Sequence, residues 1–267
     1  MKRIGWLLLL VSTLLANAHA DDRRLRLATT TSTQDSGLLD HLHPVFEAAT
    51  GIKVDVIAVG SGKALALARN GDVDVVLAHD PAAEAAFMAE GAGVDRRPVM
   101  ENDFVIVGPP ADPAGVAGAP TAREAMARIA QAGAPFVSRG DQSGTHVKEL
   151  GLFQAAGVAP GGAGYLSAGQ GMGPVLQMAG EKPGYTLADR GTWLAMRGKL
   201  DLRLLHAGDP ALKNPYHVMA VNPARHPHSR GELARAYMDF LTGAEGQALI
   251  GGFEVDGEAL FLPTAAR

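Results

Sequence analysis

The chain has 267 residues, of which 47% are hydrophobic and 19% charged, and this length suits one large domain or two lobes. Its formal net charge of −4 argues against nucleic acid or an anionic membrane as a partner, and an aromatic content of 5% argues against a sugar-stacking site. No cysteine is present, which excludes disulfides, a thiolate nucleophile and cysteine-ligated metals.

The first twenty residues have the pattern of a secretory signal peptide. Lys2 and Arg3 precede an apolar stretch over about residues 4–15, and a small-x-small cleavage site follows at residues 18–20. The apolar stretch is too short to span a bilayer. We therefore expect residues 1–20 to be removed on export to the periplasm. The mature chain then begins near Asp21 and, without the two basic residues, carries a formal charge of −6.

The next eighty residues alternate between strand and helix patterns. Pro44 is expected to kink or split the first helix, with Asp35 or Ser36 as its N-cap and Gly51 as its stop. The alternation predicts a mainly parallel sheet with helices on both faces. The expected strands are 25–28, 53–59 and 73–78, and the expected helices are 38–49, 63–69 and 81–90.

The remaining chain predicts a second α/β unit and a return to the first. A Pro/Gly/Ala-rich stretch over 108–119 follows a strand at 103–107. We predict two α/β lobes, one from residues 21–107 with 216–267 and one from 108–215, joined by two crossing hinge segments. Further strands are expected at 134–137, 185–187, 202–205 and 216–221, helices at 121–132, from 146 on, at 175–179, 189–196 and 229–250, and a loop at 157–173.

Three loops share one description, because each follows a strand, begins a helix and is rich in Ser, Thr or Gly. They cover residues 29–33, 60–62 and 138–145. Backbone N–H groups at a helix N-terminus and nearby hydroxyls donate to anions, and the helix dipole favours negative charge there. Arg139 adds a fixed positive charge with forked donors, and Gly144 allows a close approach. Any one loop could be ordinary capping, but three loops at the ends of strands predict an anion site in the cleft.

Motifs in these loops and beyond them carry a resemblance to a known family. They lie in residues 28–37, 59–62, 138–146, 169–173, 185–192 and 214–223. They resemble the periplasmic solute-binding proteins of tungstate ABC transporters over nearly the whole mature chain. The resemblance implies a type II periplasmic-binding-protein fold, a tetrahedral oxyanion as ligand, tungstate first, and a membrane permease as partner. The candidate ligand residues are Thr30, Thr31, Ser32, Ser61, Gly62, Arg139, Ser143, Gly144 and Thr145.

The choice of oxyanion stays open on the sequence. Tungstate and molybdate are unprotonated dianions that only accept hydrogen bonds, so a site made of donors suits both. Phosphate near pH 7 carries a proton part of the time and needs an acceptor carboxylate, for which Asp80 is a candidate. We favour a cap on the following helix as the role of Asp80, and we interpret Asp141 as orienting Arg139. Gln142 stands where we expect Asp in the family, which leaves the donors unchanged.

An exported hydrolase is the alternative from another class. Ser143 would be its nucleophile, His146 or His217 its base, and Asp189 the group that orients the base. Ser143 lacks the Gly-x-Ser-x-Gly elbow, and the nine histidines show no metal-ligand spacing. We therefore expect a monomeric receptor without catalytic residues, a bound metal cation or a cofactor.

Overall fold

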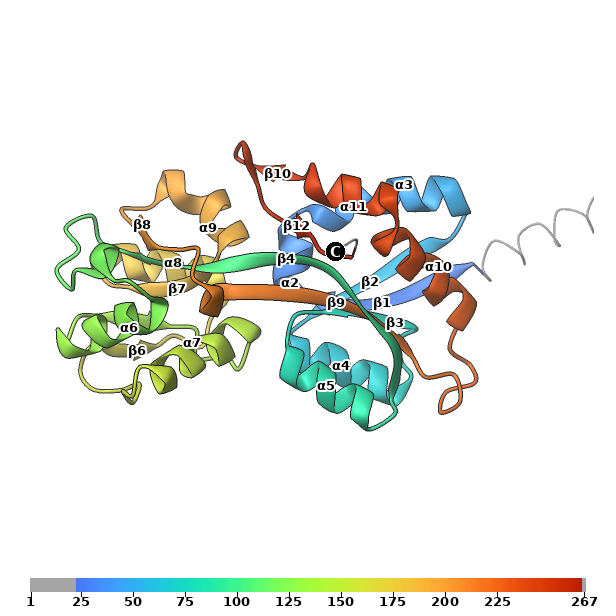
Figure 1. Cartoon of the computed structure of the whole chain (residues 1–267), viewed down its shortest axis with the longest axis horizontal. Coiled ribbons are helices and arrows are strands. Elements are labelled where there is room, and N and C mark those ends of the chain that lie inside the picture. Colours follow the sequence, from blue (N-terminus) through green and yellow to red (C-terminus); the bar gives the residue numbers. More distant parts are fainter. Residues whose placement is uncertain (1–22, 266–267) are drawn as a thin grey trace, which may run out of the picture.

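The computed structural model describes residues 23–265 and shows two α/β lobes joined by two long strands (Figure 1). The expected signal peptide, residues 1–20, lies outside the described residues. The linking strands are β4 (Gly93–Gly108) and β9 (Lys213–Val221), which run side by side from one lobe to the other. None of the helices in the described part of the chain has the length and hydropathy needed to cross a membrane.

The sheet of the first lobe has the strand order β12-β4-β9-β3-β1-β2. β1 pairs in parallel with both β2 and β3, which confirms the predicted parallel alternation, and β9 then adds antiparallel to β3. The strands not yet given are β1 (Arg24–Thr30), β2 (Lys53–Val59), β3 (Val75–Ala78) and β12 (Leu262–Pro263). The helices are α2 (Thr31–Asp35), α3 (Leu38–Thr50), α4 (Ser61–Asn70), α5 (Pro81–Ala89), α10 (Gly231–Thr242) and α11 (Ala244–Gly251).

Alternate residues of the central strands face two separate cores. Leu27 and Leu77 belong to a core that includes buried residues of α3 and α10, whereas Ala28 and Val76 belong to a core that includes α4 and α5. A strand buried on both faces has no polar alternation. This explains why all four residues of β3 are apolar.

The second lobe is built on β4, which changes partners along its length. β4 pairs with β9 up to Asp103 and with β7 and β8 from Phe104 onward, so one strand contributes to both lobes. The exact boundaries of the two lobes, predicted at residues 107/108 and 215/216, remain a prediction. The strands are β5 (Phe136–Ser138), β6 (Tyr165–Ser167), β7 (Thr186–Asp189) and β8 (Arg203–His206). The helices are α6 (Ala122–Gln131), α7 (Gly144–Ala155), α8 (Met172–Glu181) and α9 (Arg190–Met196), with short 3-10 turns η1 (Val116–Gly118), η2 (Arg197–Lys199) and η3 (Pro210–Leu212).

The prediction that Pro44 would kink or split the first helix is wrong in its stronger form, because α3 runs unbroken over Leu38–Thr50. Four buried residues of α3 pack into the core, and this burial outweighs the hydrogen bond that Pro44 cannot make. The N-cap position belongs to Gly37 at φ 80°, not to Asp35 or Ser36, although Ser36 Oγ accepts from Leu38 N at 3.3 Å. Gly51 ends the helix as predicted.

Other boundaries also differ from the predictions. β4 begins at Gly93, ten residues before the expected strand, because charged residues and two register shifts obscure the strand pattern there. The long C-terminal helix is divided at Gly243 into α10 and α11. The loop expected over 157–173 contains the short strand β6, and the expected loop over 29–33 contains the first residues of α2.

Candidate functional site

The three predicted loops lie where the lobes face each other, each between a strand and the helix after it. They connect β1 to α2, β2 to α4 and β5 to α7. A cavity of about 510 Å³ lies between the lobes beside the first and third loops. Its lining combines Thr31 and Ser32 of the first lobe with Arg139 and Thr192 of the second. The second loop adjoins them, because a Cβ built on Gly144 of α7 would lie 3.7 Å from Ser61 Oγ.

The hydroxyls of the threonine run divide into two kinds. Thr30 is buried and caps α2: its Oγ1 accepts from Thr33 N at 3.3 Å and lies 2.6 Å from Thr33 Oγ1. Thr31 and Ser32 follow in the first turn of α2 and line the cavity. The sequence could not distinguish these two roles, because the residue types are the same.

Ser61 contributes a buried hydroxyl that has no partner. Its side chain is 4% exposed, and Ser61 Oγ makes no hydrogen bond within the described residues. Leaving a buried hydroxyl unsatisfied costs about 1–3 kcal/mol, so such a group is expected where a ligand completes it. Gly62, the next candidate, is exposed in the first turn of α4.

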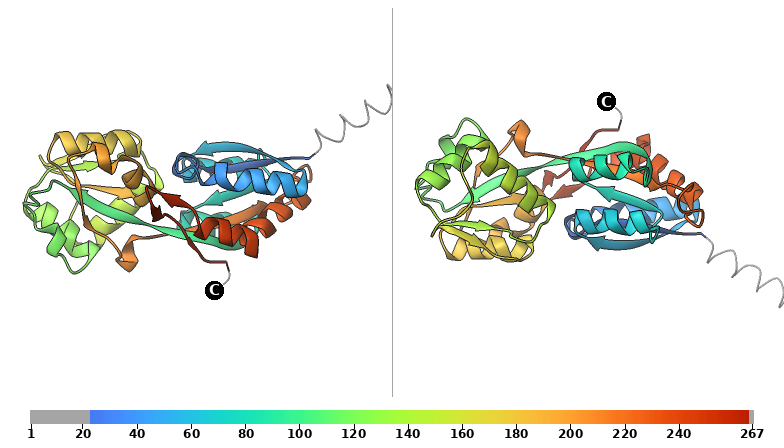
Figure 2. Two further views of the ribbon diagram at one scale, coloured as in Figure 1. Left: turned by 90° about the horizontal axis from the view of Figure 1, so that it is seen from above. Right: turned by 90° about the horizontal axis from the view of Figure 1, so that it is seen from below.

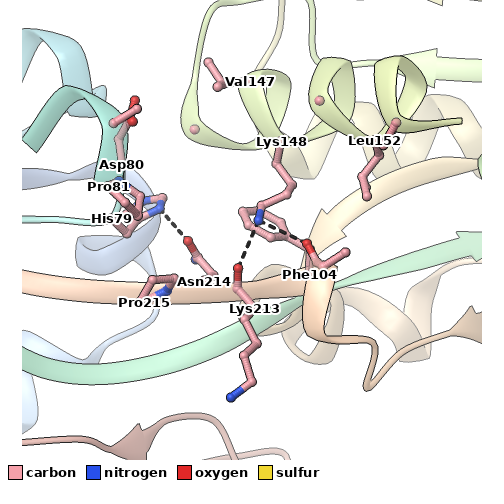
Figure 3. Close-up of a pocket in the computed structure, with 15 residues that line it drawn as sticks. His79, Asp80, Pro81, Phe104, Val147, Lys148, Leu152, Lys213, Asn214 and Pro215 are labelled. Carbon is pink, nitrogen blue, oxygen red and sulfur yellow. Dashed lines mark hydrogen bonds between the residues drawn. The ribbon is translucent and has the colours of Figure 1, made fainter. Parts of the chain in front are cut away.

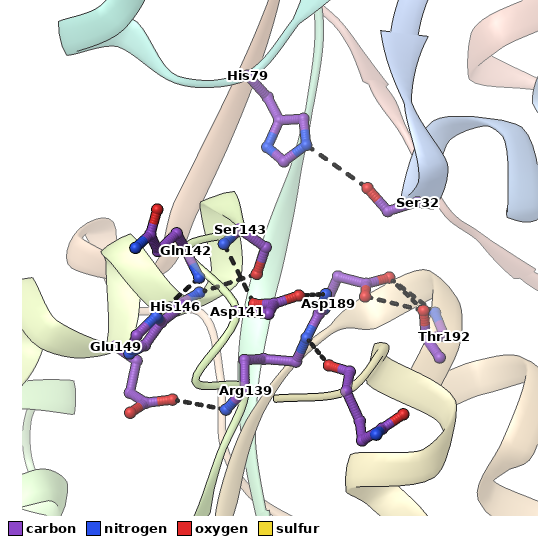
Figure 4. A network of polar contacts seen from close by, with 11 residues as sticks. Ser32, His79, Arg139, Asp141, Gln142, Ser143, His146, Glu149, Asp189 and Thr192 are labelled. Carbon is purple, nitrogen blue, oxygen red and sulfur yellow. Dashed lines mark hydrogen bonds and ion pairs between the residues drawn. The ribbon is translucent and has the colours of Figure 1, made fainter. Parts of the chain in front are cut away.

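Arg139 is held rigidly at the other side of the cavity (Figure 4). It is 8% exposed, its Nε donates to Gln170 O at 2.9 Å, and its Nη2 donates to Asp141 Oδ2 at 2.6 Å. Burial alone would raise the pKa of Asp141, but hydrogen bonds from Ser143 and Arg139 outweigh it and hold that pKa below its usual value. Asp141 therefore stays ionised and orients the guanidinium, as the sequence led us to expect.

The N-terminus of α7 approaches the first lobe directly. Ser143 caps this helix, with its Oγ accepting from His146 N at 3.3 Å, and Thr145, two residues on, is buried in the first turn. A Cβ on Gly144 would lie 3.0 Å from Cε1 of His79 in the first lobe. The absence of a side chain at Gly144 therefore lets the two lobes close together at this point.

His79 is a site residue that the sequence reasoning missed. It lies directly after β3, with Nε2 3.5 Å from Ser32 Oγ and Nδ1 2.9 Å from Oδ1 of Asn214 in β9. The amide of Asn214 donates to Asn102 Oδ1 at 2.8 Å, so Asn214 Oδ1 accepts and His79 Nδ1 carries the proton. Burial lowers the pKa of His79 and outweighs the opposing hydrogen bond to Asn214, so the ring is neutral. Its position at the end of a buried strand was the signal that could have indicated it.

Asp35 of α2 is a carboxylate that lines the cavity, and it is exposed. Two carboxylates near the cavity are engaged by protein donors instead. Asp189 caps α9, accepting from Thr192 N at 2.8 Å and from Thr192 Oγ1 at 2.8 and 2.9 Å. Asp80 caps α5 by accepting from Ala83 N at 3.0 Å, which is the role we favoured for it. Among residues 23–265, no three His, Asp or Glu side chains gather in a group that could hold a metal ion.

The alternative of a hydrolase triad finds no support in this geometry. His146 Nδ1 accepts from Gln142 N at 3.0 Å, and Ser143 Oγ accepts from the backbone N–H of His146 rather than donating to its ring. His217 faces Glu84 and Arg96 instead. Asp189 bonds Thr192 rather than a histidine.

A second interlobe cavity, of about 430 Å³, lies beyond His79 and is lined largely by apolar groups (Figure 3). Lys148 borders it but donates to the carbonyl oxygens of Ala211 and Lys213, both at 3.1 Å. This cavity has few donors to offer an anion, so the polar cavity beside Arg139 is the candidate site.

Comparison with known proteins identifies the family. A model described as the PBP superfamily domain matches residues 16–245. The tungstate-binding protein TupA of Peptoclostridium acidaminophilum is 46% identical, covering 90% of this chain and 86% of that protein. A solved structure described as the tungstate ABC transporter from Geobacter sulfurreducens is 55% identical with a TM-score of 0.80, covering 87% of this chain and 99% of that one.

A second structure, the tungstate-binding protein TupA from Desulfovibrio alaskensis G20, is 45% identical with a TM-score of 0.82, covering 90% and 98% of the two chains. The chain therefore belongs to the PBP superfamily and, within it, to the family of the TupA tungstate-binding proteins.

Proposed function

We propose that this chain is an extracytoplasmic receptor that binds tungstate between its two lobes and delivers it to the permease of an ABC importer. The observation that carries the proposal is the set of donors from both lobes beside one cavity. Thr31 and Ser32 of the first lobe and Arg139 and Thr192 of the second line the cavity. The unpartnered Ser61 and the N-terminus of α7 meet where the lobes adjoin. Two relatives named as tungstate-binding proteins, 46% and 45% identical to this chain, support the choice of ligand.

The chemistry of the site supports an unprotonated oxyanion. Tungstate and molybdate accept hydrogen bonds from every side, which suits hydroxyls, backbone N–H groups and a guanidinium. A protonated phosphate needs an acceptor, but Asp80, Asp141 and Asp189 each accept from donors of the protein, and Asp35, which also lines the cavity, is exposed. The site residues we propose are the nine sequence candidates, with Thr30 acting through its cap of α2 rather than as a direct donor. His79 is added as a group that positions Ser32.

Three further features belong to the proposal. We infer that the protein performs no catalysis, since the hydrolase residues are engaged in other contacts. We infer that it works in the periplasm after removal of residues 1–20. We also infer that one chain forms a complete site, because both lobes supply donors from the same chain.

Calorimetric titration of the mature protein with tungstate, molybdate, sulfate and phosphate tests this function. We expect tight binding of tungstate, with Asp80→Asn leaving it nearly unchanged. If the wild type binds phosphate tightly and Asp80→Asn loses that binding, the ligand is phosphate and the assignment of tungstate is wrong. If none of the four anions binds, the receptor function is wrong.

Ser61→Ala and Ser229→Ala form a matched pair for locating the site. Both hydroxyls are buried without a partner in the described part of the chain, but Ser61 adjoins Gly144 of the second lobe, whereas Ser229 lies just before α10 in the first. A hydrogen bond to a charged group contributes about 1.5–3 kcal/mol, so Ser61→Ala is expected to weaken tungstate binding by roughly 10- to 100-fold. Ser229→Ala should bind like the wild type. Equal affinities in the two variants would remove Ser61 from the site.

A further inference from the structure

A short hairpin near the C-terminus lies between the two lobes (Figure 2). It consists of β10 (Glu254–Val255) and β11 (Glu258–Ala259), joined by a two-residue turn at Asp256 and Gly257. Both turn residues have positive φ, 53° and 75°, as in the turns that favour Asp-Gly. The turn therefore presents the Asp256 and Glu258 side chains at one end of the hairpin.

The base of the hairpin belongs to the first lobe. The ring of Phe253 lies 5.6 Å from that of His41 in α3, and α11, which precedes the hairpin, packs against α3. After the hairpin, β12 pairs with β4 at Met100 and Glu101. These contacts anchor both ends of the hairpin outside the second lobe.

The tip of the hairpin contacts the second lobe. Arg197 in η2, directly after α9, donates from Nε to Asp256 Oδ2 at 2.9 Å and from Nη1 to Glu258 Oε1 at 2.5 Å. A Cβ on Gly191 of α9 would lie 3.0 Å from Cδ2 of Leu260, the residue directly after the hairpin. The helix and this end of the hairpin are therefore in close contact. Val255 of the hairpin lines the same cavity as Arg139 and Thr192.

We propose that this hairpin, residues 254–259, is a third wall of the anion site and a clasp between the lobes, and that Arg197 is the positioning residue that fastens it. The ligand part of this inference rests on the proposed function. Arg197 moves with the second lobe and its two carboxylates are tied to the first, so opening the cleft separates them. The clasp thus favours the closed state and slows release of the anion.

The size of the effect follows from exposure. Arg197 is 33% exposed and its two partners are more exposed. Ion pairs that are exposed in this way stabilise a protein only weakly. Two such pairs acting together are expected to change the dissociation rate by about fivefold. Because exposed pairs are screened by salt, the effect should shrink as ionic strength rises.

Arg97 offers a matched control for this test. It also joins two carboxylates, Asp95 and Asp239, and is 26% exposed, but all three residues lie in the first lobe. We expect Arg197→Ala to release tungstate about five times faster than the wild type in stopped-flow measurements, and Arg97→Ala to release it at the wild-type rate. Asp256→Asn with Glu258→Gln should match Arg197→Ala, and combining all three changes should add little more.

A second measurement needs no ligand. The chain contains no cysteine, so cysteines introduced at the exposed positions Ala86 in the first lobe and Gln131 in the second are its only attachment sites for spin labels. Arg197→Ala should move the distance distribution between the labels to longer values, and Arg97→Ala should not. Unchanged distances in Arg197→Ala would overturn the clasp, whether or not tungstate binds. Absence of binding in the wild type would overturn only the proposed function.

Discussion

Arg139 is fixed by bonds to its side chain and its backbone before any ligand arrives. Besides the contacts of its guanidinium, its backbone N–H donates to Glu149 Oε2 at 3.4 Å. Glu149 is fully buried, and it also accepts from the hydroxyl of Tyr165 at 2.7 Å. A guanidinium that is already oriented loses little conformational freedom when an anion binds. Arg139 can therefore contribute to tight binding of an anion, because the protein already holds its donors in position.

Arg139→Ala is the first prediction at this scale. Removing the guanidinium leaves a desolvated dianion without its counter-charge, for which truncated buried ion pairs suggest a loss of about 2–5 kcal/mol. Arg139→Lys should recover only part, because the forked donor is lost. Arg128→Ala is the control, since Arg128 bonds Glu124 and Gly115 O in the same lobe away from the cavity. A calorimetric affinity for Arg139→Ala within about threefold of wild type, under about 0.7 kcal/mol, would contradict the role.

At the scale of elements, the site depends on how closely α7 approaches the first lobe. The helix begins at Gly144 against His79, whose ring lies 4.6 Å from that of Tyr216 and is bonded to Asn214. A ring held in this way cannot move aside easily. The contact therefore sets how far the N-terminus of α7 can approach Ser61.

Gly144→Ala tests this contact. The new methyl would meet Cε1 of His79 at 3.0 Å, so we expect the lobes to close less fully and tungstate affinity to fall about tenfold. Folding should tolerate the change, because Gly144 is a helical residue without positive φ. Gly151→Ala in the same helix meets no atom within 4 Å and should keep full affinity while raising stability by about 0.4–1 kcal/mol. Equal calorimetric affinities in both variants would show that α7 does not limit closure.

For the whole molecule, two buried histidines link stability to pH. Burial lowers the pKa of His79 and also of His43, which bonds Tyr237 OH at 2.9 Å. Below their ordinary value of 6.5, the unfolded chain takes up protons that the folded chain does not. The free energy of unfolding therefore falls as the pH drops below about 6.5, until the lowered pKa values are reached. Glu149, whose pKa burial raises, works in the opposite direction and offsets part of this loss.

Urea unfolding at pH 7.5 and 5.5 measures this linkage. We expect the wild type to be less stable at pH 5.5, and His79→Gln and His43→Gln each to reduce the difference between the two pH values. His41→Gln is the control, because His41 is an exposed residue of α3. A pH difference that neither buried variant changes would contradict the assignment. Tungstate affinity should stay flat between pH 7 and 9, because the anion stays an unprotonated dianion over that range.

The sequence by itself determined the features that neighbouring residues encode. The alternation of β1, β2 and β3 with helices, the stop at Gly51 and the donor-rich loops all depend on periodicity, turn residues and caps within a few positions. These short-range patterns were sufficient for the two-lobed fold class. Of the nine candidate ligand residues, Thr31, Ser32 and Arg139 line the cavity.

Only the tertiary structure decided how distant segments meet. His79 bonds Ser32 and Asn214, 47 and 135 positions away, and Arg197 reaches Asp256, 59 positions away. The integrity of α3 at Pro44 likewise depends on core packing that local propensity does not contain. A hydroxyl at Thr30 and one at Ser61 look alike in a sequence, but one is consumed by a helix cap and the other is buried without a partner. That difference arises from packing between elements, because burial and partners are set by residues far away in the chain.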